Sequence, residues 1–396
     1  MKLLIAVPAF NEEDSIVQII ERCIEAKEHI VEGGVVDDIR ITVVSDGSTD
    51  RTVELASRYL DKIDLIIFER NKGYGAAIKK AWDNSDAEIV GFLDADGTCE
   101  PKFFKSLIDE LVKAEVDIVL GCRLNADSKM PMVRKLGNSI FAKLLSAISS
   151  NKVRDTASGM RVLRRSSLNK IYPLPDGLHF TPAMSAKAML SGNLTISEID
   201  MPYHERDGES KLHVIKDGIR FLAVILQTAF AFRPSRPLGT IGIVFLLLGT
   251  LPMLQPALHY LQYRNVEEWM IYRFVVFNLM ATAGAMVLAA AYLSSRLVSI
   301  VLLRQNARGI TDVVYRVFMA SNVVIYVAIV LAAMGVAMVV PSIIQLATTG
   351  STYEHWSRFI IMSQFVTTAT VLIVTKAVDL ILELLMGRLS FLDEQV

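Results

Sequence analysis

Short apolar runs alternate with amphipathic segments through the first half of the chain. Runs typical of buried strands occupy residues 3–7, 39–44, 65–68, 89–93 and 118–120. Between them, apolar residues recur at helical spacing over residues 15–26, 49–60, 76–83 and 101–113. This alternation predicts an α/β domain with a largely parallel sheet. In such a sheet, ligands bind where the strands end at their carboxyl edge.

The second half of the chain is far more apolar. Four stretches that are long enough to cross a bilayer occupy residues 238–258, 272–293, 317–346 and 359–385. A span needs about 20 mostly apolar residues, and the mean hydropathy of +0.40 is high for a protein without such segments. We therefore expect an α-helical membrane bundle of four helices over residues 237–396.

A segment between the two halves has the pattern of an amphipathic helix. Over residues 213–232, Ile215, Ile219 and Leu222 recur at spacings of three and four, while Lys216 and Arg220 fall on another face. One interpretation is a helix that packs on the sheet and faces solvent. Because a predicted span follows at once, a helix that lies in the membrane interface is favoured. The expected organisation is a domain over 1–212, an interfacial region over 213–236 and the membrane domain.

The charges of the loops predict how the chain crosses the membrane. Four arginines, Arg296, Arg304, Arg308 and Arg316, lie in or beside the loop between the second and third predicted spans. The loops on the opposite side place only Arg264 and Arg358 near the spans. Because arginine-rich loops stay in the cytoplasm, the domain over 1–212 is also expected there. This pattern predicts a multi-pass protein of the plasma membrane.

Net charge and cysteine content narrow the class of protein. The net charge of -1 argues against nucleic acid as a partner, because binding a phosphate backbone requires a broad excess of basic residues. The three cysteines have neither the spacing of zinc ligands nor the even number of a disulfide framework, which favours a reducing compartment. The sequence does not determine the oligomeric state, and a homo-oligomer stays open.

Two carboxylates follow the fourth predicted strand. Asp94 and Asp96 are separated by one alanine and followed by Gly97, so one interpretation is that both are turn formers. In the other, the two side chains converge where the strand ends, and a hard divalent cation with oxygen ligands relieves their repulsion. The cofactor that this second interpretation predicts is Mg²⁺ or Mn²⁺.

Six segments in order along the chain carry a resemblance to a known family. They are VPAFNEE (7–13), SDGSTD (45–50), RNKGYGAA (70–77), FLDADGTCEP (92–101), DTASGMRVLRR (155–165) and HERDGESKL (204–212). This series resembles the family-two glycosyltransferases, whose GT-A fold is an α/β, Rossmann-like domain for nucleotide-sugars. Within them it is most similar to the polyprenyl-phosphate glycosyltransferases, which include the dolichol-phosphate mannose and glucose synthases. The resemblance covers about residues 3–232, and the membrane bundle is similar only in kind.

The resemblance implies a donor-binding set and an acceptor-binding set. For the nucleotide-sugar donor the set is Pro8, Ala9, Glu12, Asp46, Lys72, Gly73, Asp94 and Ala95, with Asp94 and Asp96 as the metal ligands. For the phosphate of a polyprenyl acceptor the set is Arg123, Arg134, Arg206, Ser210 and Lys211. Two alternatives stay open, since Asp46 could form an Asx turn with Gly47 and Glu12 could cap the first helix.

Asp155 and Asp96 are the catalytic candidates. Asp155 matches the acid usually assigned as the catalytic base in the family, and the structural alternative is a loop ion pair with Arg154 or Arg161. A phosphomonoester with a second pKa of about 6 is already mostly dianionic at neutral pH, so little proton remains for a base to remove. The alternative role for Asp155 is to orient the acceptor or the sugar.

Two departures from the family pattern limit what the resemblance implies. Where the mannose synthases commonly have Asp-x-Asp-x-Gln, this chain has Asp94-Ala-Asp-Gly-Thr98, so the sugar and the base of a UDP- or GDP-hexose stay open. The chain contains no Gln-x-x-Arg-Trp motif, which disfavours a processive polysaccharide synthase. The expected activity is inverting transfer of one hexose to dolichyl or undecaprenyl phosphate at the cytoplasmic membrane face. The alternatives are transfer to a lipid hydroxyl, as in a glycolipid synthase, and a non-enzymatic scaffold that senses nucleotide-sugar or translocates lipid.

Overall fold

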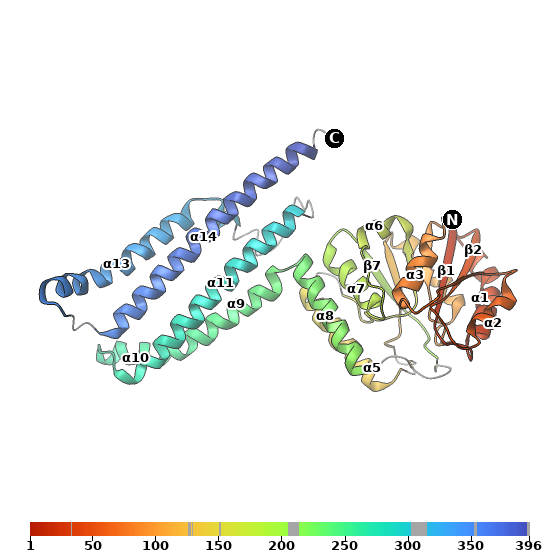
Figure 1. Cartoon of the computed structure of the whole chain (residues 1–396), viewed down its shortest axis with the longest axis horizontal. Helices are drawn as coiled ribbons and strands as arrows, with labels where there is room; N and C mark the ends of the chain where they lie inside the picture. The colour runs from red at the N-terminus through yellow and green to blue at the C-terminus, as the bar shows by residue number, and fades with distance from the viewer. Residues whose placement is uncertain are drawn as a thin grey trace. The chain divides into compact units, whose positions relative to one another are not determined.

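The chain divides into two compact units, Met1–Phe232 and Arg233–Val396 (Figure 1). The computed structural model describes residues 1–32, 34–125, 128, 130–149, 152–204, 214–301, 315–351 and 355–393. The predicted amphipathic helix therefore belongs to the first unit. The separate interfacial region over residues 213–236 stays a prediction.

A seven-stranded sheet forms the centre of the first unit. Its strands are β1 (Lys2–Ala9), β2 (Asp38–Ser45), β3 (Asp64–Ile67), β4 (Ile89–Phe92), β5 (Ile118–Cys122), β6 (Arg161–Arg164) and β7 (Ile196–Asp200). The spatial order is β3-β2-β1-β4-β6-β5-β7. The five predicted strands are all present, and the sheet is Rossmann-like as expected. It is mixed, because β6 runs antiparallel to both of its neighbours.

The direction of β6 determines where the loop before it lies. Arg161, the first residue of β6, is opposite Phe92 at the end of β4, and it also pairs with Leu120 in β5. An antiparallel strand begins at the edge where its parallel neighbours end. The loop over residues 155–160 is thus brought to the same edge as the loops that follow β1, β2, β4 and β5.

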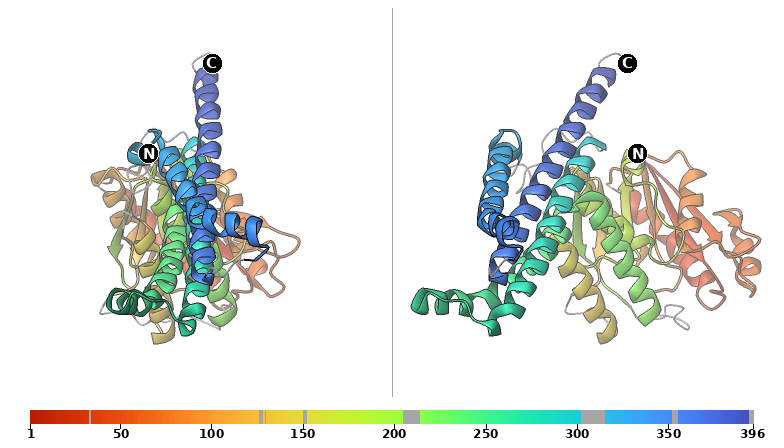
Figure 2. Two further views of the ribbon diagram at one scale, coloured as in Figure 1. Left: turned by 90° about the vertical axis from the view of Figure 1, so that its left-hand side faces the viewer. Right: turned by 60° about the vertical axis from the view of Figure 1, so that its left-hand side comes forward.

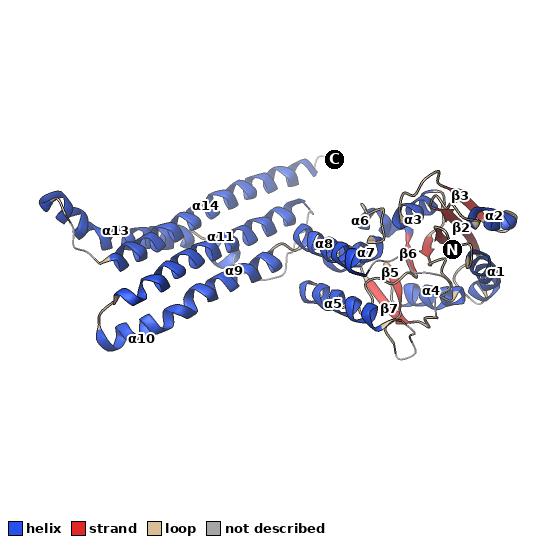
Figure 3. Cartoon of the chain, turned by 60° about the horizontal axis from the view of Figure 1, so that its bottom comes forward, coloured by secondary structure: helices blue, strands red, loops and turns tan. Residues whose placement is uncertain are grey.

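Helices cover both faces of the sheet, as Figures 1 and 3 show. One face packs against α1 (Ile16–Val31) and α4 (Phe104–Lys113), and the other against α3 (Tyr74–Asp83) and α7 (Phe180–Ser191). In β1, Leu3 and Ile5 point to the first face and Leu4 to the second, as the two-residue period of a strand requires. Shorter helical segments are α2 (Thr52–Ala56), η1 (Ser57–Tyr59), η2 (Pro101–Phe103), η3 (Arg165–Ser167) and α6 (Leu168–Ile171).

Two further helices lie next to one another beyond β5. They are α5 (Met132–Ile148), which the sequence did not predict, and α8 (Val214–Phe232), which matches the predicted amphipathic segment (Figure 3). Phe141 and Phe221 meet edge to face with their ring centroids 6.2 Å apart. A shared apolar cluster, including Leu145 and Ile225, ties both helices to α7 and β5. These helices therefore form one wall of the first unit.

The second unit is helical. It contains α9 (Ser235–Thr250), η4 (Leu251–Met253), α10 (Leu254–Tyr263), η5 (Glu268–Met270), α11 (Ile271–Val301), the π-helical turn η6 (Tyr315–Met319), α13 (Val323–Thr349) and α14 (Trp356–Asp393). Within this unit α9 runs beside α11 and α13 beside α14 (Figures 1 and 2). A Cβ at Gly242 would lie 2.7 Å from Cγ of Leu288, so the absence of a side chain lets α9 and α11 approach closely.

Three helical segments of the described residues have the length and composition of membrane spans: Ser235–Tyr263, Glu268–Val301 and Val323–Thr349. They contain or overlap the first three predicted spans. The fourth predicted stretch lies inside α14, which is not one of these three, so the count of four spans stays a prediction. Polar contacts join α14 to α11, because Asp379 accepts hydrogen bonds from Tyr292 and Arg296.

Candidate active site

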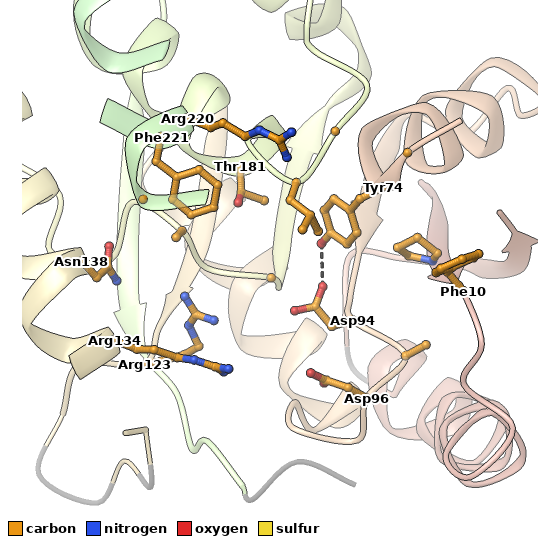
Figure 4. A pocket seen from close by; sticks show the side chains of 18 of the residues that line it. Phe10, Tyr74, Asp94, Asp96, Arg123, Arg134, Asn138, Thr181, Arg220 and Phe221 are labelled. Carbon is orange, nitrogen blue, oxygen red and sulfur yellow. Dashed lines mark hydrogen bonds between the residues drawn. The ribbon is translucent and has the colours of Figure 1, made fainter. Parts of the chain in front are cut away.

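A cavity of about 520 Å³ lies where the loops meet at the carboxyl edge of the sheet (Figure 4). Its lining comes from the loops after β1, β2, β3, β4 and β5, from the loop before β6, and from α5 and α8. Of the predicted donor set, Pro8, Ala9, Glu12, Asp46, Gly73, Asp94 and Ala95 line this cavity. Lys72 is not among the lining residues, and its ammonium group lies over the ring of Phe68, 4.5 Å from the centroid.

The two carboxylates that follow β4 lie at one end of the cavity. Asp96 is buried, and its Oδ1 accepts hydrogen bonds from the amide and the hydroxyl of Thr98. Oδ1 of Asp94 accepts a hydrogen bond of 2.6 Å from the hydroxyl of Tyr74. Within the described residues, no cluster of three or more His, Cys, Asp or Glu side chains could hold a metal. Two carboxylates still suit Mg²⁺, which commonly binds one or two protein carboxylates together with substrate phosphates and water.

Asp46 holds the glycine-rich loop that follows β3. Its Oδ1 accepts the amide of Lys72 at 2.7 Å, and its Oδ2 accepts the amide of Gly73 at 2.9 Å. Burial raises the pKa of Asp46, although both amides act to lower it. The carboxylate bonds to a distant loop and not to the amide two residues ahead, so the Asx-turn alternative is wrong. Gly73 has φ of +110°, and a Cβ there would lie 2.4 Å from the carbonyl oxygen of Asp176, which explains the need for glycine.

Glu12 lies where the chain leaves β1. Its carbonyl oxygen accepts the amides of Ser15 and Ile16 at the start of α1, so its backbone supports the helix end while the residue lines the cavity. Phe10 lines the same region (Figure 4). Supporting the start of α1 and lining the cavity are thus compatible for Glu12.

A buried ion pair joins the loop after β5 to the loop before β6. Nε of Arg123 lies 2.7 Å from Oδ2 of Asp155, and Nη2 lies 2.9 Å from Oδ1. Asn138 on α5 donates a third side-chain hydrogen bond to Oδ1 at 2.5 Å, and its own oxygen accepts from the amide and hydroxyl of Thr156. Burial alone would raise the pKa of Asp155, but the charge and hydrogen bonds of Arg123 hold it below its usual range.

The alternative ion pairs for Asp155 do not form. Arg154 binds Glu198 and Asp200 instead. Arg161 is fully buried, and it donates to the carbonyl oxygens of Thr156 and Ser158 and to the hydroxyl of Ser185. Burial lowers the pKa of Arg161 to about 10. The guanidinium of Arg161 therefore braces the backbone of the loop that presents Asp155.

The rest of the cavity lining is basic and apolar. Arg123 and Arg134 lie across from Asp94 and Asp96, while Arg220 and Phe221 reach in from α8 (Figure 4). Phe141 on α5 also lines the cavity. Arg220 forms an ion pair with Asp217. The predicted acceptor residues Arg206, Ser210 and Lys211 lie in residues 205–213, outside the described part of the chain.

Several lining residues were not predicted as site residues, among them Tyr74, Asn138, Gly159 and Arg220. Tyr74 and Gly159 stand inside quoted motifs, so their positions were visible although their contacts were not. No sequence pattern marks Asn138 as a site residue, because it is a single amide on a helix that the sequence did not predict. Arg220 was assigned to the polar face of a membrane-interface helix.

Comparison with known proteins identifies the family. Residues 4–172 match the profile of glycosyl transferase family 2. A dolichyl-phosphate hexose transferase of Haloferax volcanii is 30% identical over 220 residues, which cover 54% of this chain and 89% of that protein. The chain belongs to glycosyl transferase family 2.

Two longer relatives match this glycosyltransferase over a similar region. The low-salt glycan biosynthesis hexosyltransferase Agl6 of Haloferax volcanii is 31% identical over 254 residues, 62% of this chain and 59% of the relative. The dodecaprenyl-phosphate galacturonate synthase of Rhizobium johnstonii is 27% identical over 259 residues, 64% of this chain and 74% of the relative. The match thus spans less than two thirds of the length of Agl6.

The contacts of Asn138 lead to a prediction about stability. Asn138→Ala would remove a donor to a buried carboxylate and leave the polar groups of Thr156 without their acceptor, at a cost of about 1–3 kcal/mol. Asn138→Asp should cost more, because it places a second carboxylate against Asp155. Thermal unfolding of the purified full chain measures both. Equal stability of Asn138→Asp and the unaltered protein would contradict the contact between residues 138 and 155.

Proposed function

We propose that this glycosyltransferase moves one hexose from a UDP- or GDP-sugar to a polyprenyl phosphate at the cytoplasmic face of the membrane. The observation that carries the proposal is the division of one cavity into two chemically different ends. Asp94 and Asp96 line one side of this cavity, Arg123 and Arg134 lie across from them, and Arg220 reaches in from α8 (Figure 4). An anionic acceptor and a donor whose pyrophosphate binds a cation would fit these ends respectively.

The carboxylate end suits the nucleotide-sugar. Asp94 and Asp96 would hold Mg²⁺ or Mn²⁺, and such a cation, when bound, stabilises the negative charge of the departing nucleoside diphosphate. The loop held by Asp46 places the backbone of Gly73 at the cavity wall, where glycine lets a ligand approach the chain closely. The donor-binding roles of the residues at this end rest on this arrangement.

The arginine end suits a phosphate that arrives from a membrane. Guanidinium groups bind phosphate through paired hydrogen bonds. Beside them, the outer face of α5 exposes Met132, Val133, Leu136 and Ile140, each more than half exposed, and an apolar face next to basic residues is typical of interfacial helices. Relatives named for dolichyl phosphate and dodecaprenyl phosphate support the same class of acceptor.

The chemical step that fits this geometry is an in-line displacement. A phosphate oxygen of the lipid attacks the anomeric carbon, the bond from that carbon to the nucleoside diphosphate breaks, and the configuration inverts. Both oxygens of Asp155 already accept hydrogen bonds. We therefore assign Asp155 to holding Arg123 in place, and not to removing a proton from the acceptor. Asp96 contributes as the carboxylate that faces the donor.

The same observation weighs against the alternatives. A lipid hydroxyl would need a base, and the carboxylate that the family resemblance offered for that role is occupied by Arg123 and Asn138. A protein that only senses nucleotide-sugar would have no use for a basic end next to an apolar helix face. Lipid translocation by the second unit could accompany the transfer reaction and is a separate question.

The proposal is tested by identifying the product. Purified protein would be incubated with UDP- and GDP-hexoses, undecaprenyl or dolichyl phosphate and Mn²⁺, and the lipids analysed by mass spectrometry. We expect one hexose on the lipid phosphate, no product in excess chelator, and none with Asp96→Ala. Glycosylation of diacylglycerol or ceramide in place of the lipid phosphate would contradict the proposed acceptor. In sealed vesicles, external donor should react only when the cytoplasmic face is outermost.

A pH profile separates the two kinds of acceptor. The lowered pKa of Asp155 keeps it ionised from about pH 5 upward, because its usual value is about 3.9. An acidic limb near pH 6 would then belong to the lipid phosphate, whose second pKa is about 6. Asp155→Asn should reduce the rate by about 100-fold through misplacement of Arg123, with that limb retained. Loss of the limb in the variant would instead indicate that Asp155 is a general base.

A further inference from the structure

The hydroxyl of Tyr74 lies in contact with one of the two carboxylates at the donor end. It donates to Oδ1 of Asp94 at 2.6 Å, the contact drawn in Figure 4. Tyr74 is the first residue of α3, so the helix fixes its backbone. Its ring packs edge to face against Phe92 and Phe180, with centroids 6.4 and 6.3 Å apart. The hydroxyl is therefore held at a defined point.

The other oxygen of Asp94 faces the loop before β6. A Cβ added to Gly159 would lie 1.9 Å from Oδ2 of Asp94, which means that the carboxylate packs directly against the backbone of this glycine. Asp94 is thus held between the phenol on one side and Gly159 on the other.

We propose that Tyr74 is a positioning residue that aims the carboxylate of Asp94 at the divalent cation of the donor complex. The inference rests on the proposed function, which places that cation at Asp94 and Asp96. Carboxylates that bind metals are commonly oriented by hydrogen bonds from a second layer of residues, and removing such a bond typically weakens metal binding by about 10–100-fold. Tyr74 has the geometry of such a partner, and Gly159 leaves the carboxylate little room to turn away.

The test measures Mn²⁺ binding directly. The full-length protein in detergent would be titrated with Mn²⁺ in the presence of UDP, and the free ion counted by electron paramagnetic resonance. Tyr74→Phe keeps the ring and its packing but removes the hydroxyl, so we expect the Kd for Mn²⁺ to rise by about 10–100-fold. Asp96→Ala provides the reference for loss of the site.

Tyr172→Phe is the matched control. The hydroxyl of Tyr172 is also buried but has no hydrogen-bond partner within the described structure, and this residue does not line the cavity. The control should bind Mn²⁺ as the unaltered protein does. Gly159→Ala is a second, independent variant, because its methyl group must displace the Asp94 carboxylate and should weaken Mn²⁺ binding as well.

The possible results are distinct. If the unaltered protein binds Mn²⁺ with UDP and Tyr74→Phe binds it equally well or more tightly, the role of Tyr74 is overturned while the cation site stands. If the unaltered protein does not bind Mn²⁺ in the presence of UDP, the proposed cation site fails, and the inference fails with it. Should Tyr74→Phe not fold, unchanged Mn²⁺ binding by Gly159→Ala would overturn the idea that Asp94 must be held in this orientation.

Discussion

The buried ion pair between Arg123 and Asp155 is the interaction on which the site depends. It joins the loop after β5 to the loop before β6, two strands that pair antiparallel. Removing one partner of a buried ion pair typically lowers the free energy of unfolding by about 3–5 kcal/mol, because the other charge is left buried without compensation. The pair also gives Arg123 one orientation, with its guanidinium at the cavity wall. A cation held in this way is ready for an anionic acceptor without further ordering.

In the proposed function, the two groups of charged residues in the cavity have complementary roles. Two carboxylates at the donor end repel a phosphate unless a cation is bound between them, whereas the arginines at the other end attract one. An acceptor phosphate and a donor pyrophosphate would therefore be directed to different places in the same cavity. The apolar faces of α5 and α8 then border the end at which a lipid phosphate would enter. Charge and hydrophobicity thus give a physical reason for placing the two proposed substrates at different positions in the cavity.

Much of the catalytic domain could be predicted from local pattern. The five strands that were expected are short, mainly apolar runs, and the polar segments that follow them could be located because parallel strands end at one edge. The strand β6 escaped prediction because only Val162 and Leu163 are apolar between its terminal arginines. The edge strand β7 is only half-buried, so it lacks a strong hydrophobic signal. The family resemblance, and not the pattern alone, directed attention to the loop before β6.

The contacts inside the site could not be predicted in the same way. Asn138 contacts Asp155 only because α5 packs on α7 and α8. Nothing in the local sequence around either residue predicts this contact. The partner of Asp155 was sought among its neighbours Arg154 and Arg161, but Arg123 reaches it because two strands are adjacent in space. Lys72 was assigned to the donor through its motif, yet its side chain lies over Phe68. Contacts between segments that are distant in the sequence depend on tertiary packing, and they cannot be predicted from the local pattern of a single sequence.

The division of the cavity into a cation end and an arginine end is open to a direct measurement. The ³¹P resonance of a short-chain polyprenyl phosphate, bound to the full-length protein with UDP in detergent, would be recorded with Mg²⁺ and then with the paramagnetic ion Mn²⁺. If the acceptor phosphate binds beside Arg123 in the cavity that holds the cation, Mn²⁺ should broaden its resonance strongly, and Arg123→Ala should remove the effect at the same lipid concentration. An acceptor resonance that is equally sharp with Mn²⁺ and Mg²⁺, when the lipid is fully bound, would contradict the shared cavity.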